Sequence, residues 1–352
     1  MKKRILLSWL LVSVSMLTGC SKIIHFTKSP KVTASNTAEI LLNEERYALV
    51  LPSESDAYDD KVAEGYSEIM EIAGRDFVVE RPEHSTTSSQ QKIIEQLTDE
   101  HISCIAISPN DAEALTDELK AAMEQGIDVC TFDQPGNPEA RELYINPSGC
   151  EETAETMLDA VLDLSGGAGQ WAILSVSAVS DSQGGWIDSI KVRMNDEAYR
   201  DLDLLEIAYG NDMEQTSYDQ TRALLMNYQD LRVICALSPT GLLAACRAVS
   251  DMGMNVKVTG FGLPSELEEY VGDGSVCPYF YLRNPIDTGR ITAYVSVALH
   301  SSQISGAIDE GFIAGDLGDF SVTAAQDGGT EVIVGSPVKV DETNLGEWIE
   351  VF

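Results

Sequence analysis

Short apolar segments rich in β-branched residues alternate with helix-like segments along most of this chain, in two consecutive series. The first series runs from about Tyr47 to Ile145, and the second from about Glu151 to Val271. Apolar strands separated by long helical connections are typical of parallel βαβ units. The strand segments are apolar enough to be covered on both faces, as parallel sheets require. The sequence therefore predicts an α/β protein with two similar domains, each built on a parallel sheet.

The expected elements can be given as ranges. Strands are expected at residues 47–51, 77–79, 104–107, 129–132, 143–145, 171–176, 204–208, 233–236, 256–260 and 279–282. Helices are expected at residues 58–73, 90–100, 151–164, 183–197, 214–228, 241–252, 264–271 and 285–300. Asp111 is expected to cap one further helix, in which Leu115, Leu119 and Ala122 recur at helical spacing. The tail from residue 301 breaks the alternation, with strands expected only at 332–334 and 338–340.

The amino-terminal residues indicate export. A basic start, Lys2-Lys3-Arg4, precedes an apolar run from Ile5 to Leu17 that is short for a membrane span. Leu17-Thr18-Gly19-Cys20 resembles the lipoprotein box of bacterial signal peptides, which implies cleavage before Cys20 and lipidation of its sulfur. We therefore expect a signal peptide at residues 1–19 and a polar tether at 20–45, with the protein extracytoplasmic and anchored to the cell membrane.

Charge and residue usage exclude several function classes. The formal net charge of -34 disfavours nucleic acid as a partner, since a phosphate backbone would be repelled. The four histidines are scattered, and no cysteine pair has C-x-x-C spacing, so no metal site is predicted. Gly166-Gly167-Ala168-Gly169 precedes a strand instead of following one, which is the wrong context for a phosphate or dinucleotide loop. No cofactor is expected.

One strand ends in a pattern that points to ligand binding. Residues 129–132 are followed directly by Asp133, Gln134 and the turn residues Pro135-Gly136. In open α/β sheets, ligands bind at the carboxyl edge of the strands. A carboxylate and an amide at that edge can bond the hydroxyls of a sugar. Asp133 could instead simply form the turn.

Several stretches together resemble a known family over essentially the whole mature chain. The matching stretches are residues 105–110, 129–133, 143–146, 183–188, 258–262, 284–289 and 337–345. In this order and spacing they are similar to the type I periplasmic sugar-binding proteins of ABC transporters, particularly rhamnose-binding proteins and their autoinducer-binding relatives. The resemblance implies two Rossmann-like lobes joined by a three-segment hinge. The lobes would comprise residues 46–146 with 284–334 and residues 147–283 with 335–352.

The resemblance also implies where a ligand would bind. It places Asp133 and Gln134 at the sugar, and it puts a polar pair at Ser182 and Gln183, although these could be only a helix cap and a surface amide. Arg283 and Asn284 would lie in a crossing segment at the cleft floor. Ser238, Tyr58, Asp59 and Ser53 would complete the set. Tyr58 would be a stacking platform, or alternatively a surface packing residue.

Three positions bear on which ligand is bound. Rhamnose-type relatives tend to carry Trp where this chain has Arg283, which leaves the identity of the sugar open. Ser53 stands where autoinducer-binding relatives carry Lys, which argues against that furanosyl signal. Trp186 lies one turn into a helix and is interpreted as a core residue.

The sequence thus predicts a monomeric, non-enzymatic binding protein. It would capture a monosaccharide, a rhamnose-like deoxyhexose or a pentose, and deliver it to the permease and ATPase of an ABC importer. One alternative is a sensor that presents its ligand to a membrane signalling protein. Another is a sugar-processing enzyme with Asp133 and Asp181 as paired carboxylates. No spacing indicates such a tuned pair.

Overall fold

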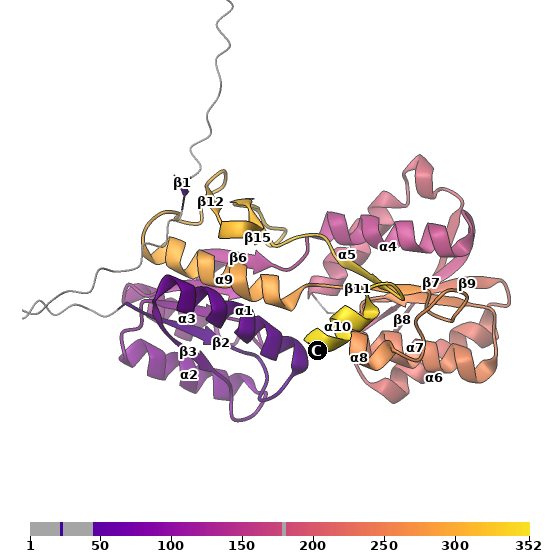
Figure 1. Cartoon of the computed structure of the whole chain (residues 1–352), viewed down its shortest axis with the longest axis horizontal. Helices are drawn as coiled ribbons and strands as arrows, with labels where there is room; N and C mark the ends of the chain where they lie inside the picture. The colour runs from indigo at the N-terminus through magenta and orange to yellow at the C-terminus, as the bar shows by residue number, and fades with distance from the viewer. Residues whose placement is uncertain (1–21, 24–44, 178–180) are drawn as a thin grey trace, which may run out of the picture.

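The computed structural model describes residues 22–23, 45–177 and 181–352, and it divides most of them between two lobes (Figure 1). Cys20, the predicted lipidation site, lies outside the described residues. Among the described residues, no helix is both long enough and apolar enough to span a membrane.

The first lobe is built on a sheet of seven strands in the order β14-β15-β6-β5-β4-β2-β3. Neighbouring strands are parallel except β14 and β15. The strands are β2 (Arg46–Val50), β3 (Asp76–Glu80), β4 (Cys104–Ile107), β5 (Asp128–Phe132), β6 (Leu143–Asn146), β14 (Thr323–Ala324) and β15 (Thr330–Ile333). One face is covered by α1 (Ala57–Ala73) and α9 (Pro285–His300), and the other by α2 (Thr87–Asp99) and α3 (Thr116–Glu124).

The second lobe is built on a smaller, entirely parallel sheet in the order β10-β9-β7-β8. Its strands are β7 (Gly169–Ser175), β8 (Leu202–Tyr209), β9 (Leu231–Ala236) and β10 (Lys257–Gly260). Two helices, α4 (Cys150–Ser165) and α5 (Asp181–Arg193), cover one face. The other face is covered by α6 (Glu214–Asn227) and α7 (Pro239–Met252).

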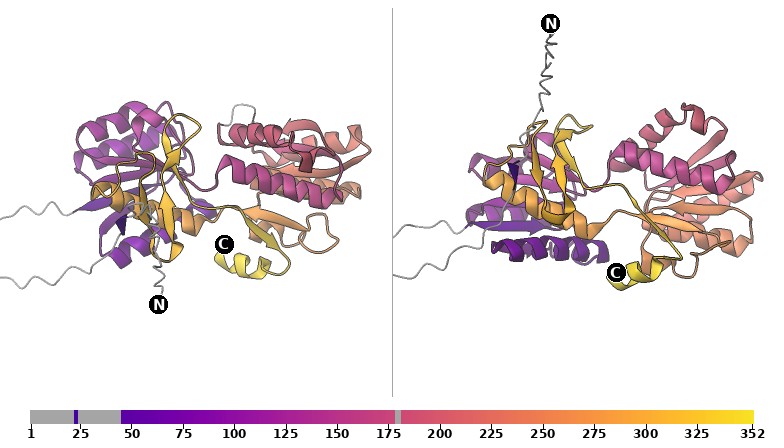
Figure 2. Two further views of the ribbon diagram at one scale, coloured as in Figure 1. Left: turned by 90° about the horizontal axis from the view of Figure 1, so that it is seen from above. Right: turned by 45° about the horizontal axis from the view of Figure 1, so that its top comes forward.

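The chain passes between the two sheets three times (Figure 2). It leaves the first lobe after β6 and returns after β11 (Tyr279–Leu282) through α9. It then leaves again between β15 and β16 (Val338–Asp341), which pairs antiparallel with β11. Because β5 and β6 are parallel to one another, and β7, β9 and β10 likewise, each lobe gathers the carboxyl ends of its strands at one edge.

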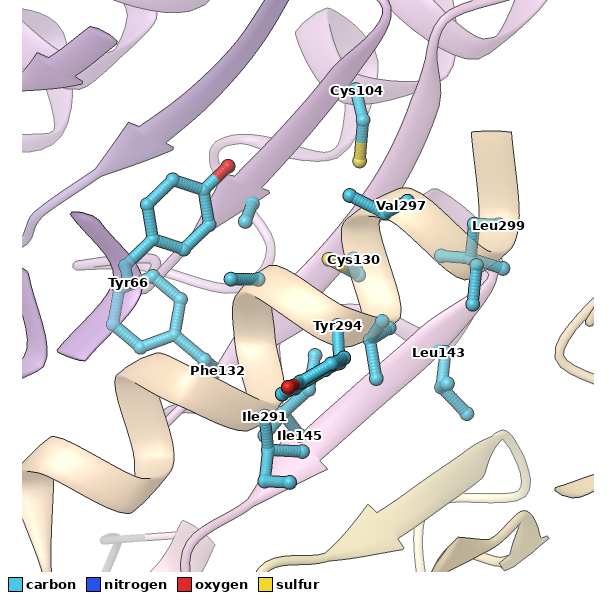
Figure 3. Packing of buried hydrophobic residues seen from close by; sticks show 14 of the residues in the cluster. Tyr66, Cys104, Cys130, Phe132, Leu143, Ile145, Ile291, Tyr294, Val297 and Leu299 are labelled. Carbon is cyan, nitrogen blue, oxygen red and sulfur yellow. The ribbon is translucent and has the colours of Figure 1, made fainter. Parts of the chain in front are cut away.

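The core of the first lobe depends on a helix from late in the sequence. Ile291 of α9 packs with Phe132 of β5 and Ile145 of β6, and all three side chains are almost fully buried (Figure 3). Burying such side chains contributes roughly 1.5–3 kcal/mol each. α9 is therefore part of the framework that holds the ends of β5 and β6.

The prediction of an α/β fold with two parallel sheets is confirmed, and most expected elements agree within two or three residues. The prediction that Asp111 caps a helix is wrong. Its carboxylate accepts from the N–H groups of Glu113 and Ala114 in a turn, and α3 begins only at Thr116. The helix expected over 264–271 is limited to α8 (Pro264–Leu267), and the one expected over 183–197 ends at Arg193, before the short 3-10 helix η2 (Glu197–Tyr199).

The tail contains more structure than its glycine-rich sequence predicts. It adds β12 (Gly311–Ile313), β13 (Asp319–Ser321), β14 and the terminal helix α10 (Leu345–Val351). The two residues of strand β1 (Lys22–Ile23) pair with β12. Short 3-10 turns occur at η1 (Pro138–Ala140) and η3 (Gly315–Leu317). The six described cysteines are free thiols, and five of them are buried.

The contact between α1 and α9 yields a stability prediction. A Cβ atom added at Gly289 would collide with the backbone carbonyl of Val62, so we expect Gly289→Ala to destabilise the protein by about 2 kcal/mol through overpacking. Gly346 in α10 has open space around it, so Gly346→Ala should stay within about 1 kcal/mol of wild type. Urea unfolding measures both, and equal stabilities would contradict the close helix contact.

Candidate functional site

Asp133 lies directly after β5, at the carboxyl edge of the first sheet. Its backbone is left-handed, with φ 56°, a conformation that Asp tolerates better than most residues. The hydroxyl of Tyr144, on the neighbouring strand β6, donates to the Asp133 carbonyl at 2.8 Å. This turn directs the strand away from the sheet at Asp133, as the sequence pattern predicts.

The Asp133 carboxylate meets Arg283, which lies in the crossing segment between β11 and α9. Nη1 of Arg283 donates to Oδ1 of Asp133 at 3.0 Å, and the two side chains are 22% and 16% exposed. Burial alone would lower the pKa of Arg283, but the charge and hydrogen bond of Asp133, together with the Tyr58 and Tyr144 side chains, outweigh it and the pKa is raised. Arg283 therefore stays a cation beside the Asp133 carboxylate.

Three aromatic rings surround the Arg283 guanidinium. Its central carbon lies 5.4 Å from the ring centre of Trp186, 5.7 Å from that of Tyr58 and 5.8 Å from that of Phe261. Tyr58 belongs to α1 of the first lobe, whereas Trp186 and Phe261 belong to the second. These distances are within the range of cation–π attraction, so residues of both lobes hold this cation in place.

Two cavities meet at Arg283 and Trp186, which line both of them. The first has a volume of about 330 Å³ and lies between the ends of β5 and β6, the start of α4 and the loop after β14. Its other polar lining residues are Asp133, Tyr144, Asn146, Cys150, Glu151, Glu152, Thr323, Gln326, Asp327 and Glu331. The second has a volume of about 290 Å³ and lies at the carboxyl ends of the second sheet. Its polar and aromatic lining includes Tyr58, Gln134, Gln183, Asp212, Ser238, Phe261 and Tyr281.

The structure thus brings together most of the residues predicted to bind a ligand, namely Asp133, Gln134, Gln183, Arg283, Ser238 and Tyr58. It also shows that two of them have structural partners. The Gln183 amide accepts from Ser175 Oγ at 2.6 Å and from the Val176 N–H, and it donates to the Leu237 carbonyl at 3.0 Å. Ser238 caps α7 by accepting from the Gly241 N–H. Gln183 thus ties the ends of β7 and β9 together, and Ser238 fixes the start of α7.

Three of the remaining predicted residues, Asn284, Ser53 and Asp59, are not among the described residues that line the cavities. Asn284 caps α9, accepting from the N–H groups of Ile286 and Asp287, which fixes the helix that follows Arg283. Ser53 donates to the Asp59 carboxylate, and Asp59 is buried. Ser182 lies in α5, and its side chain is outside the described part of the structure. The binding roles of all these residues remain predictions.

Sequence reasoning missed two members of the site. Trp186 is only 5% exposed, as a core residue should be, yet it forms a wall of both cavities and packs against Phe261 with ring centres 5.2 Å apart. Helical spacing cannot distinguish a core position from a cavity wall. Phe261 directly follows β10, so the strand-end rule that singled out Asp133 could have found it.

The site contains no evident metal centre. Within the described residues, no group of three or more His, Cys, Asp or Glu side chains is arranged to hold a metal ion. The arrangement instead offers an ion pair, aromatic faces and amide or carboxylate oxygens, which suit a neutral polar molecule.

Comparison with known proteins agrees with this geometry. Residues 47–303 match a family model described as a periplasmic binding protein domain. The chain belongs to the periplasmic binding protein family. Its type I architecture is confirmed, and members of this family are extracytoplasmic solute-binding proteins, not enzymes, as the sequence predicts.

Solved structures of family members are similar over nearly their full length. An ABC transporter solute-binding protein from Clostridium phytofermentas with bound L-rhamnose is 38% identical, with 88% of this chain and 99% of that chain covered and a TM-score of 0.77. A sugar ABC transporter protein from Actinomyces odontolyticus is 29% identical, with 86% and 97% covered and a TM-score of 0.77. An AI-2 complex of LsrB from Clostridium saccharobutylicum, 17% identical with 86% and 99% covered, shares the fold with a TM-score of 0.71.

Asp59 yields a pH-dependent prediction. Burial raises its pKa from 3.8 to about 7 in the folded protein. Between these values the folded protein holds a proton that the unfolded chain releases, so Asp59 makes stability fall as pH rises from about 4 to about 7 and stay level above that. Asp59→Asn should therefore raise the melting temperature at pH 7.5, by an amount that vanishes near pH 3.5.

Calorimetric scans of both proteins across this pH range measure the effect. Glu139→Gln is the control, since Glu139 lies on the surface and its pKa is lowered by Lys120. A stabilisation by Asp59→Asn that is the same at pH 3.5 and 7.5 would contradict the raised pKa of the buried Asp59 carboxyl.

Proposed function

We propose that this protein is the substrate-binding subunit of an ABC importer and that it captures a monosaccharide between its two lobes. The observation that carries the proposal is the meeting of Asp133, from the strand edge of the first lobe, with Arg283, from a crossing segment, beside cavities lined by both lobes. A ligand bound there would contact groups of both lobes, so it would favour closure of the hinge.

The chemistry of the site suits a sugar. A sugar presents a ring of hydroxyls, each able to donate and accept, together with apolar C–H faces. Asp133 can accept from hydroxyls and Arg283 can donate to them, with charge-assisted hydrogen bonds. The rings of Tyr58, Trp186 and Phe261 offer apolar surfaces at the same place. We propose Gln134, Gln183 and Ser238 as further contacts.

The relatives favour a rhamnose-like deoxyhexose or a pentose. The 38% identical protein from Clostridium phytofermentas was solved with L-rhamnose bound. A less similar solute-binding protein, from Burkholderia graminis, was solved with D-arabinose. By this likeness the chain is a solute-binding protein of a sugar ABC transporter, and we propose that its closed form delivers the ligand to the permease. The proposed lobes are residues 46–146 with 284–334 and residues 147–283 with 335–352.

Titration calorimetry against L-rhamnose, D-ribose, D-xylose, L-arabinose, D-galactose and D-glucose tests this function. We expect at least one of these sugars to bind, and Arg283→Met to weaken its binding about tenfold or more, because donors to the hydroxyls are lost. Arg247→Met is the control, since Arg247 pairs with Glu214 at the surface and should leave affinity unchanged. Binding of none of the sugars, or equal effects of the two substitutions, would contradict the proposal.

We also propose that the mature protein is held at the cell membrane by a lipid on Cys20. We expect Cys20→Ser to abolish incorporation of a labelled fatty acid in cells and to release the protein from the membrane fraction. The reason is that the Cys20 sulfur is the atom that would carry the lipid. Cys150→Ser, which changes a free thiol in the folded body, should keep both properties. Fatty acid incorporation into the Cys20→Ser variant would contradict the anchor.

A further inference from the structure

The cavities at the proposed site contain a single cation and several anions. Among the described residues that line them, Arg283 is the only Lys or Arg, and six residues are carboxylates: Asp133, Asp212, Glu151, Glu152, Asp327 and Glu331. A ligand with a carboxylate would therefore have one partner for its charge and several groups that repel it.

That one cation is already neutralised. Arg283 is bound to Asp133 at 3.0 Å, and the two side chains lie in segments fixed by the protein. Asp133 is held by its turn and by Tyr144, and Arg283 is followed by the capped start of α9. A ligand carboxylate could reach Arg283 only by displacing Asp133 or by lying beside it, and like charges at such short range are strongly unfavourable.

The other carboxylates do not restore a positive site. Asp327 is paired with Arg141, and Glu151 with Arg193. Asp212 and Glu152 have no ion-pair partner among the described residues, so they add negative charge to the cavity walls. Burial raises the pKa of Glu331, which accepts from Asn146 and offers an anion no positive partner. The net electrostatic field at the site thus opposes an anion.

We propose that the Asp133–Arg283 pair is a charge filter, through which the site accepts neutral sugars and rejects acid sugars such as uronates and aldonates. The proposal rests on the proposed sugar-binding function. A neutral sugar can insert its hydroxyls between the two groups, donating to Asp133 and accepting from Arg283, without leaving either charge unpaired. An acid sugar cannot do so, because Asp133 remains as a second anion.

If the Asp133–Arg283 pair acts as a charge filter, removing the Asp133 charge should allow the site to bind acid sugars. Asp133→Asn removes the negative charge and leaves Arg283 buried without a counterion, a state that a ligand carboxylate can relieve. Asn is the suitable replacement because it also tolerates the left-handed backbone of this position. Asp309→Asn is the control: it makes the same charge change, at another left-handed backbone (φ 69°), on an exposed residue that lines neither cavity.

Calorimetry would compare the best-binding neutral sugar of the panel with D-galacturonate, D-glucuronate and L-rhamnonate. For the wild type and for Asp309→Asn, we expect each acid sugar to bind at least about 100-fold more weakly than the neutral sugar. For Asp133→Asn, we expect the neutral sugar to bind about tenfold more weakly. At least one acid sugar should bind this variant about tenfold or more tightly than it binds the wild type, and the double variant Asp133→Asn/Arg283→Met should lose that gain.

The outcomes separate the inference from the function on which it rests. If the wild type binds a neutral sugar and an acid sugar with similar affinity, sugar binding stands and the charge filter is overturned. The filter is also overturned if Asp133→Asn is folded but gains no acid sugar, or if Asp309→Asn gains one equally. If Asp133→Asn does not fold, the wild-type ratio decides alone. If no neutral sugar binds the wild type, the proposed function fails and the filter with it.

Discussion

The contact between Asp133 and Arg283 joins a strand edge of one lobe to the segment through which the chain returns from the other. Each group is nearly buried, and each would be unfavourable there without its partner. The surrounding turn, aromatic rings and helix cap can all be understood as supports for this one pair. Because the cation and the anion neutralise each other, the pair makes the cleft polar without creating a net charge that would favour a charged ligand.

The polar residues around this pair divide into two kinds. Gln183, Ser238 and Asn284 bond to nearby backbone groups, where they fix the ends of β7 and β9 and the starts of α7 and α9. Asp133 and Arg283 bond chiefly to each other, so both can exchange that bond for one to a ligand. Rigid strand ends that carry a few exchangeable groups are the arrangement that binding with little reorganisation requires.

Much of this organisation could be predicted from the sequence. The two series of strands and helices follow from the period of apolar residues, and Asp133 followed from its place after a buried strand. Whether an amide such as Gln183 faces a ligand or the backbone depends on atoms distant in the sequence, so no local pattern distinguishes the two. Trp186 was interpreted as core because burial in a cavity wall and burial in a core select the same residue type. The tail was underestimated because α10 and the strands before it are stabilised by tertiary contacts more than by local propensity.

The place of α9 in the sequence has a consequence for biogenesis. This helix contributes to the core of the first lobe, but about 140 residues, which include α4 to β11 of the second lobe, separate β6 from it. As the polypeptide emerges in order, the early lobe exposes the apolar face that α9 will cover until most of the later lobe has been made. During export this exposed apolar surface is accessible to proteases and chaperones. It is covered only when α9, which ends at His300, packs against it.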